Sequence, residues 1–238
     1  MNKLWWANRI TRRFVCNATI GYRWQKEDSD IPRLEARLAL IKEWCRPFRV
    51  IADIGAGYGH LAKALAREHH RVYAIEYPRG AYLDLLQGIE GCLGITPLQG
   101  DGLTPLGDRP IDVAVIAGMG PNSIRHIMQR RYSLPFIIQP MQGIFRVHRQ
   151  LVEDGWSIQK AQLIDQGGRL YATWLVGQSG IDGQNKRLVP DEFCQDPLFP
   201  RLVEQRIREL QKRLTASVTP PGASWDEELQ QLKALQLC

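Results

Sequence analysis

Two kinds of apolar segment alternate along the chain from about residue 34 onwards. Short continuous apolar runs, such as Arg49–Ile54, end in glycines or charged residues, as buried parallel strands do. Other segments repeat apolar residues every three or four positions, as at Leu34, Leu38, Ile41 and Cys45, which predicts helices. The predicted strands are 49–54, 71–76, 95–99, 111–116 and 134–139, and the predicted helices are 34–45, 58–69, 79–90, 121–131 and 143–154.

The alternation ends in two consecutive strands, 156–165 and 169–177, joined by a hairpin-like turn at Gln166-Gly-Gly168. Strand–helix alternation closed by a hairpin predicts an α/β fold, a doubly wound sheet with an antiparallel edge. Beyond it, residues 179–196 are polar and glycine-containing and are predicted to form a linker. Two short apolar repeats on either side of Pro220-Pro-Gly222 predict a C-terminal helical hairpin, 197–238, packed in coiled-coil fashion. The predicted sheet domain therefore covers residues 31–178.

The composition is that of a soluble globular protein. Of 238 residues, 44% are apolar and 24% charged, which excludes disordered and fibrous classes. No segment approaches the roughly 20 apolar residues of a membrane-spanning helix, so no membrane contact is expected. The cysteines have no spacing typical of a disulfide framework or a metal site, which favours reduced thiols, a cytoplasmic location and no bound metal. They are Cys16, Cys45, Cys92, Cys194 and Cys238.

The first 26 residues contain six basic residues and no acid. Because no continuous apolar core of signal-peptide type is present, secretion is not expected. Residues 1–30 are interpreted as a poorly ordered basic extension. An organellar presequence and an arm that touches nucleic acid are the alternatives, and the formal charge of +6 is compatible with an anionic partner.

A glycine-rich loop, Asp53-Ile-Gly55-Ala-Gly57-Tyr-Gly59, lies where the first strand turns into a helix. Glycines let the backbone approach a ligand, and the helix N-terminus offers unpaired N–H groups. The spacing is GxGxG followed by His60, whereas the dinucleotide fingerprint GxGxxG would place glycine or alanine there. Asp53 would repel a pyrophosphate but suits a cationic ligand. An NAD-dependent oxidoreductase is therefore disfavoured.

Two further acids extend this candidate site. Glu76 ends the next strand, where a carboxylate can accept hydrogen bonds from both ribose hydroxyls of a nucleoside. Gly100-Asp101-Gly102 follows the third strand, in position to meet an adenine edge. A surface Glu and a simple Asp-Gly turn are the structural alternatives. Taken together, these features describe S-adenosylmethionine better than NAD.

The segments after the fourth and fifth strands carry a resemblance to a known family. Ile116-Ala-Gly-Met-Gly-Pro121 and Ile138-Gln-Pro140 are similar to the bacterial tRNA (adenine-N1)-methyltransferases that act at position 22, the TrmK family. The similarity runs from Arg33 to about Leu175. It implies a Rossmann-like class I methyltransferase sheet with a coiled-coil-like C-terminal helical domain, S-adenosylmethionine as cofactor and tRNA as partner. Residues 56–59, Pro121 and Met141 depart from the family pattern.

Matching positions give the expected site residues. We expect the cofactor to be bound by Asp53, Gly55, Gly57, Glu76, Asp101, Gly102 and Ala117. We expect the substrate to be bound by Gly118, Met119, Gly120, Arg125, Gln139, Pro140 and Arg146. No general base is identified, and none is required, because adenine N1 carries an in-plane lone pair.

No acidic residue occurs between Asp112 and Glu153, a span that covers the loops after the fourth and fifth strands. Doubly wound folds receive their substrates at these loops, and basic side chains there would bind phosphates. The structural alternative is a solvated helix face. Two other functions remain open: a small-molecule methyltransferase, and a non-catalytic RNA-binding protein on the same fold, which the altered 56–59 loop would permit. The basic residues and histidines of the span are Arg125, His126, Arg130, Arg131, Arg146, His148 and Arg149.

Overall fold

The computed structural model describes residues 34–129, 133–178, 190–215 and 225–235. The predicted basic extension 1–30, Arg130, Arg131 and most of the predicted linker lie outside these ranges. Within them, every predicted strand and helix is present, with ends that differ by a few residues. No helix in the described ranges is long and apolar enough to cross a membrane.

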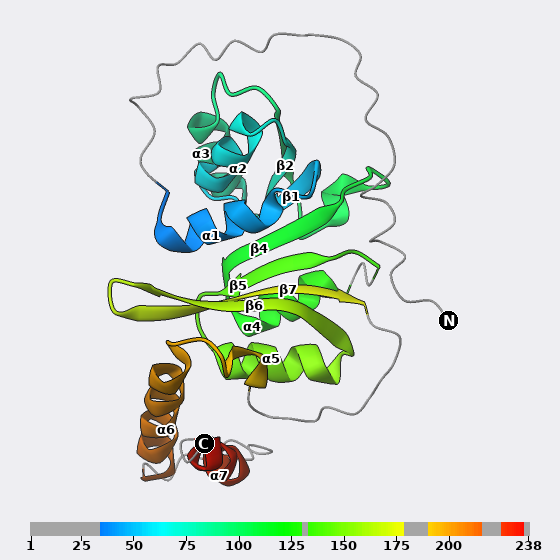
Figure 1. The fold of residues 1–238 in the computed structure, drawn as a ribbon. Helices are drawn as coiled ribbons and strands as arrows, with labels where there is room; N and C mark the ends of the chain where they lie inside the picture. Colours follow the sequence, from blue (N-terminus) through cyan, green and yellow to red (C-terminus); the bar gives the residue numbers. More distant parts are fainter. Residues whose placement is uncertain (1–33, 130–132, 179–189, 216–224, 236–238) are drawn as a thin grey trace.

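Seven strands form one mixed sheet in the order β3-β2-β1-β4-β5-β7-β6 (Figure 1). β1 to β5 are parallel, and β7 runs antiparallel between β5 and β6. The order reverses between β1 and β4, which is the switch point where doubly wound folds bind ligands. The doubly wound fold with an antiparallel edge is confirmed. The bounds are β1 Val50–Ile54, β2 Arg71–Glu76, β3 Ile95–Gln99, β4 Val113–Met119, β5 Phe136–Pro140, β6 Trp156–Gln166 and β7 Arg169–Gln178.

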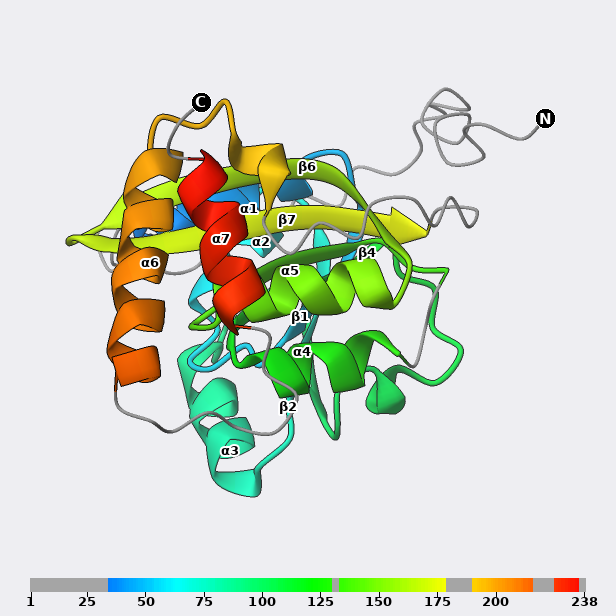
Figure 2. The ribbon, with the colours of Figure 1, turned by 90° about the horizontal axis from the view of Figure 1, so that it is seen from below.

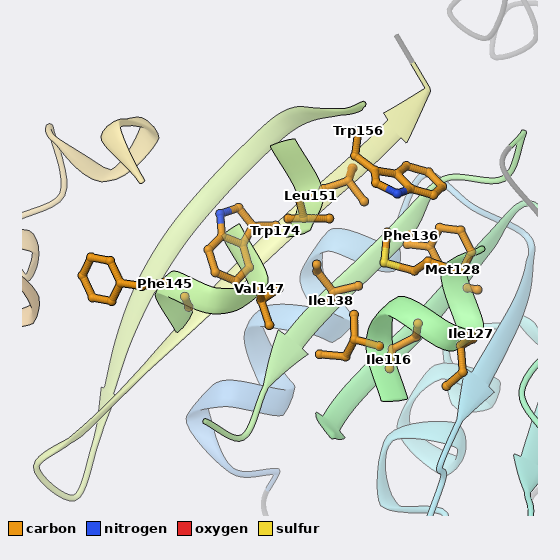
Figure 3. Close-up of a cluster of buried hydrophobic side chains, with 14 of the residues drawn as sticks. Ile116, Ile127, Met128, Phe136, Ile138, Phe145, Val147, Leu151, Trp156 and Trp174 are labelled. Carbon is orange, nitrogen blue, oxygen red and sulfur yellow. The ribbon is translucent and has the colours of Figure 1, made fainter. Parts of the chain in front are cut away.

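Helices cover both faces of the sheet (Figure 1). Each face has its own buried cluster, because successive side chains of a strand point to opposite faces: Ile51 and Val115 belong to one cluster, Ile116 and Ile138 to the other. Figure 3 shows part of the second cluster, with Phe136 packed edge-on to Trp156. One face carries α1 Ala36–Cys45, α2 His60–Arg67 and α3 Arg79–Gly88, and the other carries α4 Pro121–Met128 and α5 Ile144–Glu153.

α1 is joined to the far end of the chain. The Arg37 backbone N–H donates to Gln166 Oε1 at 3.2 Å, across 129 residues of sequence. The Lys160 ammonium of β6 lies 4.5 Å from the ring centroid of Trp44. The first described helix is thus packed against the last hairpin of the sheet.

The two predicted C-terminal helices are present as α6 Phe199–Thr215 and α7 Trp225–Leu235. They lie on the outer side of α5 (Figure 2). Their buried residues, including Ile207, Leu210 and Leu232, belong to the same cluster as α4 and α5. The helices therefore pack on the sheet domain as well as on each other, and the boundary of a separate C-terminal domain stays a prediction.

Residues 190–196, expected to be linker, are packed. A 3-10 helix, Asp191–Phe193, buries the Phe193 ring completely, and this ring lies 5.4 Å from that of Trp174. The Trp174 indole N–H donates to Glu192 Oε1 at 2.7 Å. The apolar residues around Phe193 follow neither a helix nor a strand period, so no periodicity indicated its burial.

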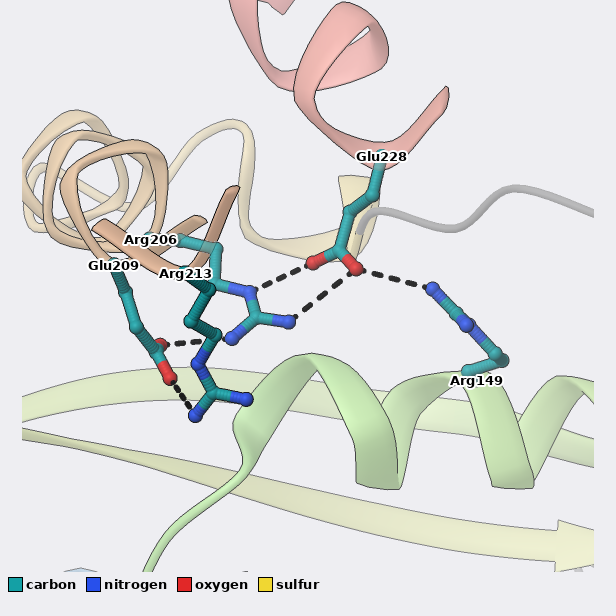
Figure 4. Close-up of polar contacts among 5 residues, drawn as sticks. All are labelled: Arg149, Arg206, Glu209, Arg213 and Glu228. Carbon is teal, nitrogen blue, oxygen red and sulfur yellow. Dashed lines mark hydrogen bonds and ion pairs between the residues drawn. The ribbon is translucent and has the colours of Figure 1, made fainter. Parts of the chain in front are cut away.

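A buried carboxylate joins α5, α6 and α7 (Figure 4). Glu228 of α7 is 1% exposed. Its Oε1 accepts from Arg206 Nε of α6 at 2.7 Å, and its Oε2 accepts from Arg149 Nη2 of α5 at 3.1 Å. Arg206 also donates to Glu209. Each charge therefore has an opposite partner, as burial requires.

Candidate functional site

A cavity of about 380 Å³ opens at the carboxyl ends of β1, β2 and β4, beside the switch point. Its size suits a nucleoside-sized ligand. Five of the residues expected from sequence line it: Gly55, Glu76, Asp101, Gly102 and Met119. The other lining residues are Ile54, Ile75, Tyr77, Pro78, Gly100, Asn122, Ser123, His126 and Ile127.

The glycine loop approaches the neighbouring strands closely. Gly55 has φ +74°, a left-handed conformation that favours glycine, and its N–H donates to the Ile75 carbonyl at 2.8 Å. A Cβ at Gly55 would collide with the Met119 Cε atom. The backbone conformation thus favours glycine here, whereas the end of the flexible Met119 side chain could move aside; in the structure Gly55 and Met119 together close one wall of the cavity.

Glu76 presents a fixed carboxylate to the cavity. The side chain ends β2 and is buried, with 8% of its surface exposed. Its Oε1 accepts a hydrogen bond from the Gly57 N–H at 2.6 Å, which ties the carboxylate to the glycine loop. Gly57 does not line the cavity itself; its contact to Glu76 orients the residue that does.

Asp53 lies below the glycine loop and does not line the cavity. It is 3% exposed, and its Oδ2 atom has no hydrogen-bond partner within the described residues. Burial, with a smaller contribution from the nearby Glu76 charge, raises the pKa of this carboxyl to about 7. The expected direct contact of Asp53 with the ligand is replaced by a position one layer deeper.

The raised pKa of Asp53 gives a testable pH dependence. The folded protein keeps this proton up to about pH 7, whereas the unfolded chain releases it near pH 4. The contribution of Asp53 to the free energy of unfolding therefore falls as the pH rises from about 4 to about 7. We expect Asp53→Asn to flatten this fall, measured by urea unfolding at pH 5 and pH 8. Equal pH dependence in variant and wild type would contradict the assignment.

Asp101 and His126 meet at the cavity mouth. The His126 Nε2 atom lies 3.1 Å from Asp101 Oδ2, and both residues line the cavity. The sequence placed His126 in the acid-free span without a specific role and gave no role to Tyr77, Asn122 or Ser123. The signal available was their position directly after strands β2 and β4, which places them at the edge where ligands bind.

The expected substrate wall is only partly at the cavity. Gly118, with φ +78°, is exposed, and Gly120 precedes the first turn of α4. Ala117 instead pairs with Gln139 inside the sheet. The Gln139 side chain is 1% exposed, and its Nε2 donates to Thr173 Oγ1 at 2.7 Å. Gln139 and Pro140 are therefore buried and do not line the cavity, and their contact with the substrate stays a prediction.

Arg125 and Arg146, the two arginines expected to bind the substrate, differ in their contacts. Arg125 makes a two-point ion pair with Asp154, with Nε–Oδ2 2.9 Å and Nη2–Oδ1 2.5 Å, between α4 and the end of α5. Its guanidinium is turned away from the cavity, which argues for a structural role. Arg146 lies in the first turn of α5 and donates to Asn122 Oδ1 at 2.7 Å. Since Asn122 lines the cavity, Arg146 lies at its rim.

Comparisons with known proteins agree with this geometry. The chain is 26% identical over 158 residues to the tRNA (adenine(22)-N(1))-methyltransferase of Bacillus subtilis, covering 62% of this chain and 66% of that protein. The crystal structure of the B. subtilis M1A22 tRNA methyltransferase TrmK superposes with a TM-score of 0.72 at 20% identity, covering 86% of this chain and 99% of that one. Mycoplasma capricolum TrmK, bound to S-adenosyl-homocysteine, gives a TM-score of 0.69 at 18% identity, with 86% and 96% covered.

These matches confirm the resemblance and the fold that the sequence predicted. A family model described as a methyltransferase domain matches residues 34–173. This range contains β1 to β5, the glycine loop, Glu76 and the cavity. The chain therefore belongs to the methyltransferase domain family.

Proposed function

We propose that this protein uses S-adenosylmethionine to methylate N1 of an adenine in tRNA, at position 22. The observation that carries the proposal is the cavity at the switch point, with the Glu76 carboxylate on one wall and the end of β4, where Gly118 is exposed, beside it. Relatives named as adenine-22 methyltransferases support the choice of substrate.

The residues present fit this cofactor. Glu76 is a fixed acceptor for two ribose hydroxyls, and its carboxylate is already oriented by Gly57. Tyr77 and Ile127 give the cavity apolar surface for a purine ring. A similar structure from Streptococcus pneumoniae, with a TM-score of 0.68 and 18% identity, contains S-adenosyl-L-methionine.

The chemistry requires alignment more than acid–base catalysis. When bound, S-adenosylmethionine supplies a methyl group attached to a sulfonium sulfur. The thioether that departs from this methyl group is an excellent leaving group. The N1 lone pair forms the new C–N bond while the electrons of the C–S bond pass to sulfur. Neutral adenine has no hydrogen on N1, so no proton has to be removed. Gly118 and Met119 hold the base in line with the methyl group. Positioning of this kind lowers the activation free energy by roughly 7–11 kcal/mol.

Adenine N1 takes part in base pairing and stacking, so the nucleotide has to be extruded into the site. Gly118, an exposed residue near the end of β4, carries no side chain and so leaves room at the mouth for a planar base. This geometry suits a macromolecular substrate that enters from the surface.

The test is methylation of unmodified tRNA transcripts in vitro. Purified protein, S-adenosylmethionine and a transcript with adenine at position 22 are expected to yield 1-methyladenosine, measured by mass spectrometry after digestion. A transcript with guanine at position 22 is the control and should give none. Binding of S-adenosylmethionine without 1-methyladenosine in any tRNA would reject the proposed reaction. Methylation of both transcripts would reject position 22.

A further inference from the structure

The arginines of the described residues differ in how their charge is compensated. Arg125 pairs with Asp154, Arg149 with Glu228, and Arg201 with Asp165. Arg146 and Arg169 donate instead to neutral oxygens, the Asn122 side chain and the Met141 carbonyl. Within the described ranges, no carboxylate lies at ion-pair distance from either guanidinium. These two positive charges remain available to an anionic partner.

Both arginines are linked to the cavity by a single intermediate residue. Arg146 contacts Asn122, which lines the cavity. Arg169 contacts the carbonyl of Met141, whose N–H donates to the carbonyl of the lining residue Met119 at 2.9 Å. The loop 141–143 lies between these two connections.

The sheet register places Arg169 at the edge where the substrate enters. β7 runs antiparallel to β5, with Ile138 opposite Trp174. Continuing this register, Arg169, at the start of β7, lies beyond the carboxyl end of β5. Arg146 lies on α5, just after the loop 141–143, and reaches Asn122 of α4. Arg169 contacts the same loop from β7, through the Met141 carbonyl.

The Arg169 guanidinium is held in place before any ligand binds. Its central carbon lies 5.2 Å from the ring centroid of Tyr171, which is buried, and the Arg37 guanidinium lies 5.7 Å from the same ring. Stacking on an aromatic ring and a bond to a backbone carbonyl restrict the side chain, so that less conformational entropy is lost on binding. Such a restricted conformation is typical of a side chain that binds a ligand.

We propose that Arg169 and Arg146 bind two phosphates of the RNA strand on either side of the extruded adenosine, across the loop 141–143. The inference rests on the proposed function and adds to it a residue on the β6–β7 hairpin. An extruded nucleotide needs its backbone held on both sides, and arginine binds phosphate through two parallel hydrogen bonds.

The test measures tRNA binding by the full-length protein over a series of salt concentrations, without chemistry. Arg169→Gln and Arg146→Gln are each expected to weaken binding about five- to tenfold at low salt. Each should also reduce the slope of log K against log salt by about 0.7–0.9, the value for one lost phosphate contact. Arg169→Lys keeps the charge and should keep the slope. Affinity for S-adenosylmethionine should not change in Arg169→Gln or Arg169→Lys.

Arg109→Gln is the matched control. Arg109 is also exposed and also donates to backbone carbonyls, of Pro105 and Leu106 at 3.2 and 3.1 Å, but it belongs to the segment that leads into the start of β4 and does not line the cavity. Its substitution should change the affinity for tRNA by less than about twofold, because it removes at most the long-range attraction of one distant charge to the RNA.

Two results would overturn the assignment. One is an unchanged salt slope in Arg169→Gln. The other is an equal loss in Arg109→Gln, which would indicate a general charge effect. The proposed reaction is judged separately: a reduced slope with no 1-methyladenosine from the wild type supports the phosphate contact and rejects the reaction. 1-Methyladenosine from the wild type, together with an unchanged slope in Arg169→Gln, supports the reaction and rejects the phosphate contact.

Discussion

We expect Glu76→Ala to bind S-adenosylmethionine at least about a hundredfold more weakly than the wild type. The carboxylate is fixed by the Gly57 N–H at 2.6 Å and lines the cavity where the ribose of the cofactor would lie. Hydrogen bonds to a charged group contribute roughly 1.5–3 kcal/mol each, and two are lost in this variant. Isothermal titration calorimetry with S-adenosylmethionine measures the change directly, and tRNA binding should be nearly unaffected.

The control separates ligand contact from loop stability. Glu76→Gln keeps an oxygen that can accept from the Gly57 N–H, and it is expected to restore the glycine loop but only part of the affinity. Glu90→Ala removes an exposed carboxylate after α3 and should bind S-adenosylmethionine normally. If Glu76→Ala bound the cofactor as tightly as Glu90→Ala, the cavity would not be the nucleoside site.

The second large effect is on stability. We expect Glu228→Ala to lower the free energy of unfolding by roughly 3 kcal/mol, because it removes the carboxylate that pairs with Arg149 and, among the described residues, leaves Arg206 with only the exposed Glu209. Arg206, 16% exposed, and Arg149, 30% exposed, would both lose their carboxylate. Their partial exposure keeps the expected cost at the lower end of the range for buried pairs. Denaturant unfolding followed by circular dichroism gives the value.

An exposed ion pair on the same helix pair is the control. Glu204 pairs with Arg208 on α6, and these side chains are 53% and 63% exposed. Glu204→Ala should cost less than about 1 kcal/mol. Glu228→Gln, which keeps the shape and some hydrogen bonds, should fall between the two. Equal losses in Glu204→Ala and Glu228→Ala would mean that burial of Glu228 does not matter to the packing of α7 on α5.

The fold could be predicted because its signals are local. The strands are continuous apolar runs, and the helices between them repeat with a period near 3.6 residues, so each element is encoded in its own segment. The glycine loop and Glu76 could be predicted for the same reason, since strand ends define the edge at which ligands bind. The hairpin at Gln166-Gly-Gly168 followed from its turn residues.

The partners of the charged residues could not be predicted in this way. An acid-free span suggested that Arg125 is available to phosphates, but Asp154, just after that span, folds back to pair with it. Arg169 looked like an ordinary residue of a terminal strand, and only the register of β7 against β5 brings it to the site. Such contacts depend on tertiary structure, which a linear charge pattern does not contain.

The bond between Arg37 and Gln166 has a consequence for synthesis of the chain on the ribosome. α1 emerges well before the β6–β7 hairpin, and at 5–20 residues per second the ribosome needs on the order of ten seconds to make the 129 residues between them. During this time Trp44 lacks the cover that Lys160 provides in the finished fold. Completion of the sheet thus brings together segments that are far apart in sequence, and contacts of this kind slow folding. α1 reaches its final packing only after the hairpin has left the exit tunnel.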